Sequence, residues 1–98
     1  MASTWLQMEK ALWYLIAGTR GGENRARIVR HLLERPRNPN QLAEELDLDY
    51  NTIKHHLDML EEHDVVEPSG DDYGALYFVT DRFEHHRETF EEITEHLE

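Results

Sequence analysis

Residues 38–79 read NPNQLAEELDLDYNTIKHHLDMLEEHDVVEPSGDDYGALYFV, and this stretch decides the fold. Residues 39–46 predict a short helix, which a tight connection at 47–49 joins to a second helix at 50–63. Two β-prone runs, residues 65–67 and 75–79, flank a turn that contains Gly70 and Gly74, residues that readily take positive φ. A helix, a short turn, a second helix and a hairpin, in this order, predict a helix-turn-helix followed by a β wing.

Both helices of this motif carry start signals. Asn38 is a suitable N-cap, Pro39 fits the first helical position, and Gln41 completes a capping box. Asp49 is the expected cap of the second helix. The two helix starts are therefore predicted from local chemistry.

The second helix has an apolar side and a polar side. Its apolar positions follow the spacing of a buried stripe, and they are Ile53, His56, Leu57 and Leu60. The polar residues that we assign to the opposite, DNA-contacting side are Tyr50, Asn51, Thr52, Lys54 and His55. In such motifs the second helix enters the major groove, where Asn51 would pair with an adenine edge and Lys54 with a phosphate or guanine. An ordinary solvated helix face is the alternative interpretation.

Three further helices are predicted around this motif, at residues 5–17, 24–34 and 81–97. Thr4 is the expected cap of the first helix, and Asp81 with Glu84 forms a second capping box at the start of the last. The first helix is apolar over more than one stripe, and the last has the heptad spacing of two helices that pack along their length. We therefore expect a dimer interface formed by Trp5, Leu12, Trp13, Phe83, Phe90, Ile93 and Leu97.

The charge of the chain is strongly acidic and uneven. Its 98 residues hold 21 Asp and Glu against 10 Lys and Arg, which gives a net charge of −11. Residues 18–40 carry a balance of +4, whereas residues 41–72 carry −10. An acidic, lysine-poor surface is typical of proteins from cells with molar salt, where charges are screened within about 3 Å. An ordinary acidic protein is the other explanation.

The positive balance of residues 18–40 comes from six arginines. DNA-binding domains hold phosphates with such cations, and we expect Arg25 and Arg37 to do so here. The alternative is that these arginines solubilise the chain and balance the neighbouring acids.

The composition excludes several classes of protein. Because cysteine is absent, the chain has no disulfide, no thiolate metal site and no cysteine nucleophile. It has no long apolar run and no secretory pattern, so we expect a cytoplasmic protein. Its length fits one domain over residues 1–98, with the helix-turn-helix at 39–63 and the wing at 64–79. No catalytic constellation is present, so we expect neither an enzyme nor a cofactor.

Residues 25–81 resemble the ArsR-like winged helix-turn-helix family of archaeal and bacterial transcription regulators, including those of haloarchaea. The most specific part is TIKHHLDML at residues 52–60, supported by Ala43 and Leu46 before it and by the strand residues Val65 and Val66 after it. The resemblance implies a mainly α fold with five helices and a small β hairpin. It also implies a homodimer, held by the first and last helices, that places two copies of the fourth helix in successive major grooves.

The chain departs from this family at two places. Family wings usually carry Arg or Lys at the tip, whereas Asp71 and Asp72 stand there in this sequence, which puts minor-groove insertion in doubt. Metal-sensing relatives use cysteines or an Asp/His/His/Glu set in the last helix. His85 and His96 have the spacing of that set, but Phe83 stands where a ligand is needed. We therefore expect no metal effector.

Two functions follow from these observations. The first is a homodimeric, sequence-specific regulator of transcription that binds double-stranded DNA. The second is a winged-helix module that binds protein partners and not DNA, since the −10 balance across residues 41–72 would repel phosphates at low salt.

Overall fold

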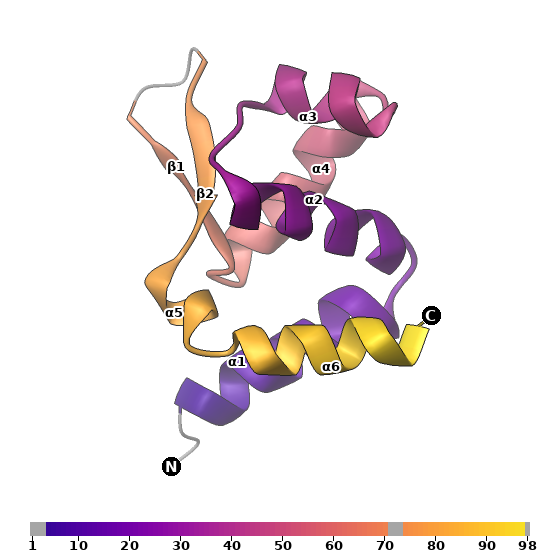
Figure 1. Ribbon diagram of the computed structural model, residues 1–98, viewed down its shortest axis with the longest axis vertical. Helices are drawn as coiled ribbons and strands as arrows, with labels where there is room; N and C mark the ends of the chain where they lie inside the picture. Colours follow the sequence, from indigo (N-terminus) through magenta and orange to yellow (C-terminus); the bar gives the residue numbers. More distant parts are fainter. Residues whose placement is uncertain (1–3, 71–73, 98) are drawn as a thin grey trace.

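A computed structural model describes residues 4–70 and 74–97, with side chains from residue 7 onward. Its elements in chain order are α1 (Thr4–Leu12), η1 (Trp13–Gly18), α2 (Gly22–Glu34), α3 (Pro39–Leu46), α4 (Tyr50–Glu62), β1 (Val66–Ser69), β2 (Leu76–Val79), α5 (Asp81–Glu84) and α6 (Arg87–Leu97). Figure 1 shows α2 across the middle of the molecule. The helices α3 and α4 and the hairpin lie on one side of it, and α1, η1 and α6 lie on the other.

The expected winged helix-turn-helix is confirmed. The side chain of Asn38 accepts a hydrogen bond from the backbone of Gln41 at 2.8 Å, and the Gln41 side chain accepts one from the Asn38 backbone at 2.9 Å. Asp49 caps α4 by accepting from the Asn51 backbone at 2.9 Å. The chain turns between the two helices at Asp47, which has a left-handed φ of 56°. Local capping therefore sets the start of each helix, as the sequence predicts.

The hairpin of the wing is joined by an isolated β-bridge to Arg37, which the sequence does not predict. β1 and β2 are antiparallel, with Pro68 opposite Tyr77. The Tyr77 backbone exchanges hydrogen bonds with Arg37, at 2.8 and 3.2 Å, on the other side of β2. Pro68 and Tyr77 are therefore a non-hydrogen-bonded pair of the ladder, in which the missing N–H of the proline leaves no bond unmade. Gly70 and Gly74 have φ of 70° and 71°, as expected, while Asp71 and Asp72 lie outside the described residues.

The first helix differs from its prediction. It continues as an α-helix to Leu12 and then widens into the π-helix η1, so it is not one α-helix over residues 5–17. Thr4 is already its first helical residue, and the position before it lies outside the described residues. The widened turn keeps Leu15 and Ile16 in the core and leaves Trp13 and Tyr14 on the surface, 40% and 50% exposed.

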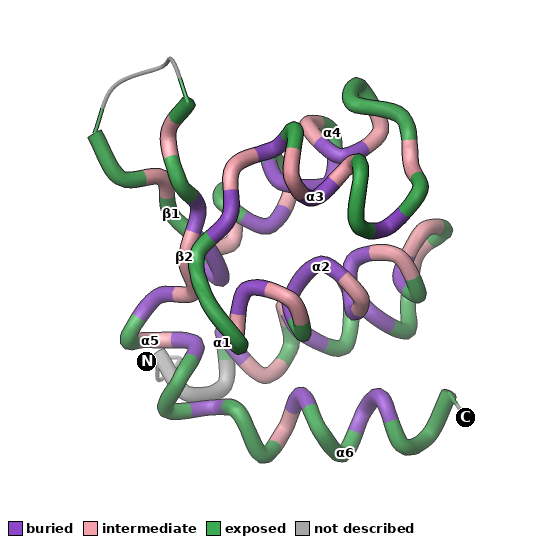
Figure 2. Tube along the Cα trace, turned by 45° about the horizontal axis from the view of Figure 1, so that its top comes forward, coloured by how far each residue is buried: buried purple, intermediate pink, exposed green. Residues whose placement is uncertain are grey.

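The last helix also differs, because it is broken at His85 and His86 into α5 and α6. Thr80 caps α5 by accepting from the Phe83 backbone at 3.0 Å, so the predicted Asp81 capping box does not form. The break lets Phe83 on α5 and Phe90 on α6 enter the same core, where their rings meet edge to face at 5.6 Å. Figure 2 shows that the buried positions of α6 lie on its side toward the rest of the molecule, where α6 packs against η1 and α1.

None of the helices in the described part of the chain combines the length and apolar character needed to cross a membrane.

The α2 helix starts in close contact with η1, and this contact generates a prediction. A Cβ on Gly22 would lie 1.8 Å from the backbone oxygen of Ile16, so Gly22→Ala forces the two helices apart. We expect it to lower the free energy of unfolding by at least about 2 kcal/mol, the usual scale of overpacking. Gly18→Ala is the matched control, since its Cβ would lie 3.4 Å from the Trp13 oxygen. Urea unfolding followed by circular dichroism measures both, and equal stability of the two variants would contradict the prediction.

Candidate nucleic-acid interface

The polar side of α4 is open to solvent. Tyr50 is 45% exposed, Asn51 and His55 are exposed, and Thr52 and Lys54 are half-buried. On the opposite side of the helix Ile53, Leu57 and Leu60 are fully buried, and His56 is 6% exposed. The described part of the chain therefore leaves the predicted reading face uncovered, with one amide, one imidazole and one phenol pointing outward.

Lys54 lies between α4 and the wing. Its Nζ donates a hydrogen bond to the Tyr77 hydroxyl at 3.3 Å and lies 3.9 Å from a carboxylate oxygen of Asp58. The hydrogen bond to Tyr77 raises the pKa of Lys54, and the charge of Asp58 adds to that effect. Lys54 is therefore a stable cation on the reading face, and it also joins α4 to β2.

Two grooves flank the exposed face of α4. One lies between α4, the start of α3 and the wing, and its lining includes Asn40, Tyr50 and Lys54. The other lies between α4 and the turn after η1, and its lining includes Arg20 and His55. The reading face is thus bordered on each side by a groove that contains one cation.

Arg20 is a candidate contact that the sequence did not single out. It is exposed, and it lines the second groove together with Asn51, Thr52 and His55. In the sequence it is one of six neighbouring arginines in the 18–40 segment, and nothing local distinguishes it from the other five. Only the approach of the η1–α2 turn to α4 identifies it.

The structure corrects the expected role of Arg25. Its side chain is 1% exposed and donates to the Leu15 carbonyl at 2.7 Å, the Arg20 carbonyl at 2.9 Å and the His56 ring at 3.1 Å. Burial lowers the pKa of Arg25, although a guanidinium stays charged in proteins. In this position Arg25 cannot reach a phosphate, and it acts inside the fold.

Arg37 is corrected in the same way. It is 4% exposed, and its Nε forms an ion pair with Glu45 at 2.5 Å. A second nitrogen lies 3.3 Å from a carboxylate oxygen of Glu34, and Arg35 reaches Glu45 at 3.8 Å. These contacts hold the connection between α2 and α3, so Arg37 supports the helix-turn-helix from inside.

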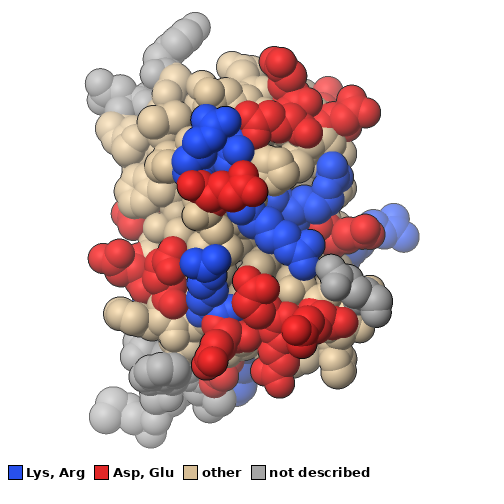
Figure 3. Space-filling view, viewed as in Figure 1, with Lys and Arg blue, Asp and Glu red and all other residues tan. Residues whose placement is uncertain are grey.

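Lys and Arg side chains also form a basic band on one face of the molecule. Figure 3 shows Lys and Arg side chains across the middle of this face, over α2, with acidic side chains on both sides of them. Arg27, on α2, donates to the Leu46 carbonyl at 2.9 Å and so ties α2 to α3. The band is distinct from the reading face, because α4 lies behind α2 in this view.

The expected dimer residues divide into two groups. Leu12, Phe83, Phe90 and Ile93 are 0% exposed and belong to the core of a single chain, so they have no surface to offer a partner. Trp13 and Leu97 remain 40% and 50% exposed. The Trp13 ring lies edge-on to the His96 ring at 6.0 Å, so η1 and the end of α6 meet at the surface. We call Trp13, His96 and Leu97 the η1–α6 patch; the side chain of Trp5 lies outside the described residues.

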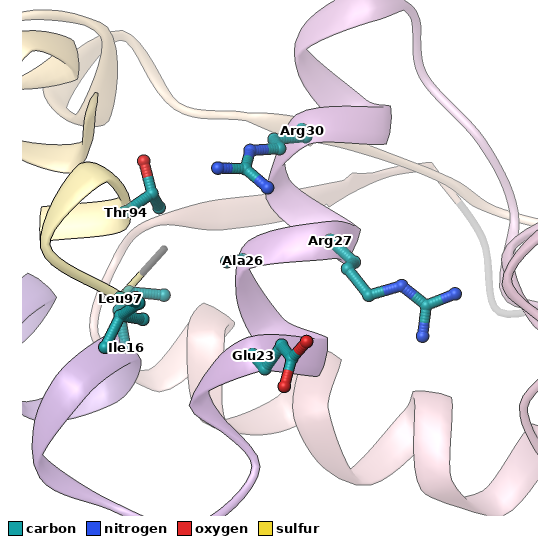
Figure 4. Close-up of a pocket in the computed structure, with 7 residues that line it drawn as sticks. All are labelled: Ile16, Glu23, Ala26, Arg27, Arg30, Thr94 and Leu97. Carbon is teal, nitrogen blue, oxygen red and sulfur yellow. The ribbon is translucent and has the colours of Figure 1, made fainter.

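A cavity of about 300 Å³ lies beside this patch, between η1, α2 and α6. Figure 4 shows the Arg30 side chain pointing toward Thr94, whereas Arg27 points to the other side of α2. Ile16, Ala26 and Leu97 form its apolar lining. The cavity shares no lining residue with the two grooves along α4, so it is separate from the reading face.

Among the residues that the structure describes, no three His, Asp or Glu side chains converge where a metal ion could bind. His85 is exposed, and His86 is 6% exposed within the turn between α5 and α6.

Comparison with known proteins agrees with this fold. The sequence model of a helix-turn-helix domain family matches residues 23–68. Two mutants of ZitR from Lactococcus lactis superpose with TM-scores of 0.59 and 0.57 at 18% identity, over 76% of this chain and 56% of theirs. Rv0081 from M. tuberculosis superposes with a TM-score of 0.68 at 16% identity, over 98% of this chain and 94% of its own. At these identities the likeness concerns the fold, and the match spans little more than half of ZitR. No curated protein has a matching sequence.

The environment of His56 predicts how stability depends on pH. Burial, followed by the charges of Arg25 and His55, lowers the pKa of His56 below its usual 6.5. The unfolded chain therefore takes up this proton more readily, so acid favours unfolding. We expect the free energy of unfolding to fall as the pH falls below 6.5. In His56→Asn, which has no imidazole to protonate at this position, the free energy of unfolding should fall less over the same pH range. Denaturant unfolding at a series of pH values measures it. Parallel profiles of the wild type and the variant would show that His56 does not contribute.

Proposed function

We propose that this protein is a sequence-specific DNA-binding regulator of transcription that acts as a homodimer. The observation that carries the proposal is the uncovered polar face of α4, in the position that a helix-turn-helix uses to read the major groove. Asn51 supplies an amide suited to an adenine edge, and His55 and Tyr50 supply further polar contacts at the surface. Arg20 and Lys54, on either side of this face, hold the two phosphate backbones.

A second candidate function is a module that binds a protein partner through the same face. The acidic side chains around α4 favour it, because Asp49, Asp58, Glu61 and Glu62 are all exposed. The burial of Arg25 and Arg37 favours it further, since two expected phosphate contacts are removed. DNA binding remains the better supported function because three features agree with it: the helix-turn-helix fold, the exposed amide of Asn51, and the cations Arg20 and Lys54 on either side of α4.

The salt dependence of DNA binding separates the two functions. Selection of duplexes from a random-sequence library in molar KCl, followed by titration of the selected duplex, tests for DNA binding. The acidic residues around α4 repel DNA over about 10 Å at 0.1 M salt but over only about 3 Å at 1 M. We therefore expect specific binding to persist in molar KCl. Absence of binding from low to molar salt, with a protein partner recovered by pull-down, would support the second function.

Substitution of a base-contacting residue should change sequence specificity, whereas substitution of a phosphate-contacting residue should change affinity for any DNA. Asn51→Ala removes a base contact, and we expect about a tenfold loss for the selected duplex but little change for random DNA. Arg20→Ala removes a phosphate contact and should weaken both duplexes alike and reduce the slope of affinity against salt. Arg87→Ala, an equal loss of charge at an exposed site on α6, is the control and should change neither. Wild-type specificity in Asn51→Ala would exclude Asn51 as a reader.

We place the homodimer contact at the η1–α6 patch, because the other described members of the predicted interface are core residues. Leu97→Glu puts a charge on this apolar surface, and we expect it to weaken dimerisation at least about tenfold. Leu76→Glu is the matched control, since Leu76 is 41% exposed but lies on β2. Sedimentation equilibrium measures both variants. Unchanged dimerisation in Leu97→Glu would place the contact elsewhere.

A further inference from the structure

Arg25 connects three parts of the fold that lie far apart in the sequence. From α2 its Nε donates to the carbonyl of Leu15, within η1, at 2.7 Å. One terminal nitrogen donates to the Arg20 carbonyl at 2.9 Å and to the Thr19 hydroxyl. The other lies 3.1 Å from Nδ1 of His56 on α4. A single buried guanidinium therefore bonds η1, the turn after it and the helix that carries the reading face.

The contact with His56 has a defined chemistry. A guanidinium has only donors, so Nδ1 of His56 accepts and its proton is on Nε2. The ring is also in close packing with the turn, because a Cβ on Gly21 would lie 2.8 Å from its Cε1. His56 lies one helical turn after Thr52 and directly after His55, two residues of the reading face. A displacement of His56 therefore moves the reading face.

The other end of the connection lies next to the proposed dimer contact. Leu15, whose carbonyl Arg25 binds, follows two residues after Trp13 of the η1–α6 patch. Leu15 itself is 0% exposed, so η1 is held in the core at this point. The hydrogen bonds of Arg25 to Leu15 and to His56 therefore connect the proposed dimer contact with the reading face.

We infer that Arg25 is a positioning residue for DNA reading, which acts through His56 to set the place of α4 relative to η1. The inference rests on the proposed function. In a dimer joined at the η1–α6 patch, the position of α4 relative to η1 determines the distance between the two reading faces. An apolar side chain in place of Arg25 would fill the same space but would not fix that geometry, since packing alone lacks the direction of hydrogen bonds.

A double-mutant cycle on DNA affinity tests this inference. The variants are Arg25→Met, His56→Leu and the two combined, with His56→Asn as the conservative variant that keeps an acceptor near the Nδ1 position. Their affinities for the selected duplex are measured by fluorescence anisotropy at neutral pH, with circular dichroism to establish that each is folded. Arg25→Lys replaces Arg25→Met if the latter does not fold. His86→Leu is the matched control, since His86 is also 6% exposed but lies between α5 and α6.

We expect each single variant to lose about tenfold in affinity and the double variant to lose no more, because coupled residues act as one unit. His56→Asn should retain affinity within about threefold, and His86→Leu should leave affinity unchanged even where it lowers stability. Losses that multiply in the double variant, or single variants that bind as the wild type does, would overturn the inference while leaving DNA binding in place. A wild-type protein that binds no duplex would overturn the proposed function as well.

Discussion

The burial of one side of α4 is the constraint on which the rest of the structure depends. Ile53, Leu57 and Leu60 are 0% exposed, and each such side chain stabilises the fold by about 1.5–3 kcal/mol. Because the helix is amphipathic, burying this stripe against the core turns Asn51 and His55 outward. The same packing energy that holds the domain together therefore also presents the reading face.

The arginines show how charge is divided between the core and the surface. A guanidinium can be buried when its donors are satisfied, and Arg25 meets this condition with backbone carbonyls and His56. Arg37 meets it with the carboxylates of Glu34 and Glu45. As a result the surface beside α4 is more acidic than the sequence of the 18–40 segment suggests. The cations that the described structure leaves along α4, Arg20 and Lys54, stand at its two borders.

The heptad pattern of the last helix shows why an apolar stripe does not identify its partner. Phe83, Phe90 and Ile93 have the spacing of a seam between two chains, but the break between α5 and α6 directs them into the core of one chain. A 98-residue chain has little interior, so it uses its large apolar residues there first. Of the predicted interface residues whose side chains the structure describes, Trp13 and Leu97 remain at the surface.

The sequence by itself determined the order of helix, turn, helix and hairpin, the caps at Asn38 and Asp49, and the polar side of α4. All of these depend on interactions within a few residues or on helical periodicity. Only the tertiary structure decided that η1 widens, that Arg37 pairs with Tyr77, that Arg25 is buried against His56, and that Arg20 approaches α4. The last three of these features join residues that are distant in the chain. Competition for a small core decides which side chain is buried and which stays at the surface.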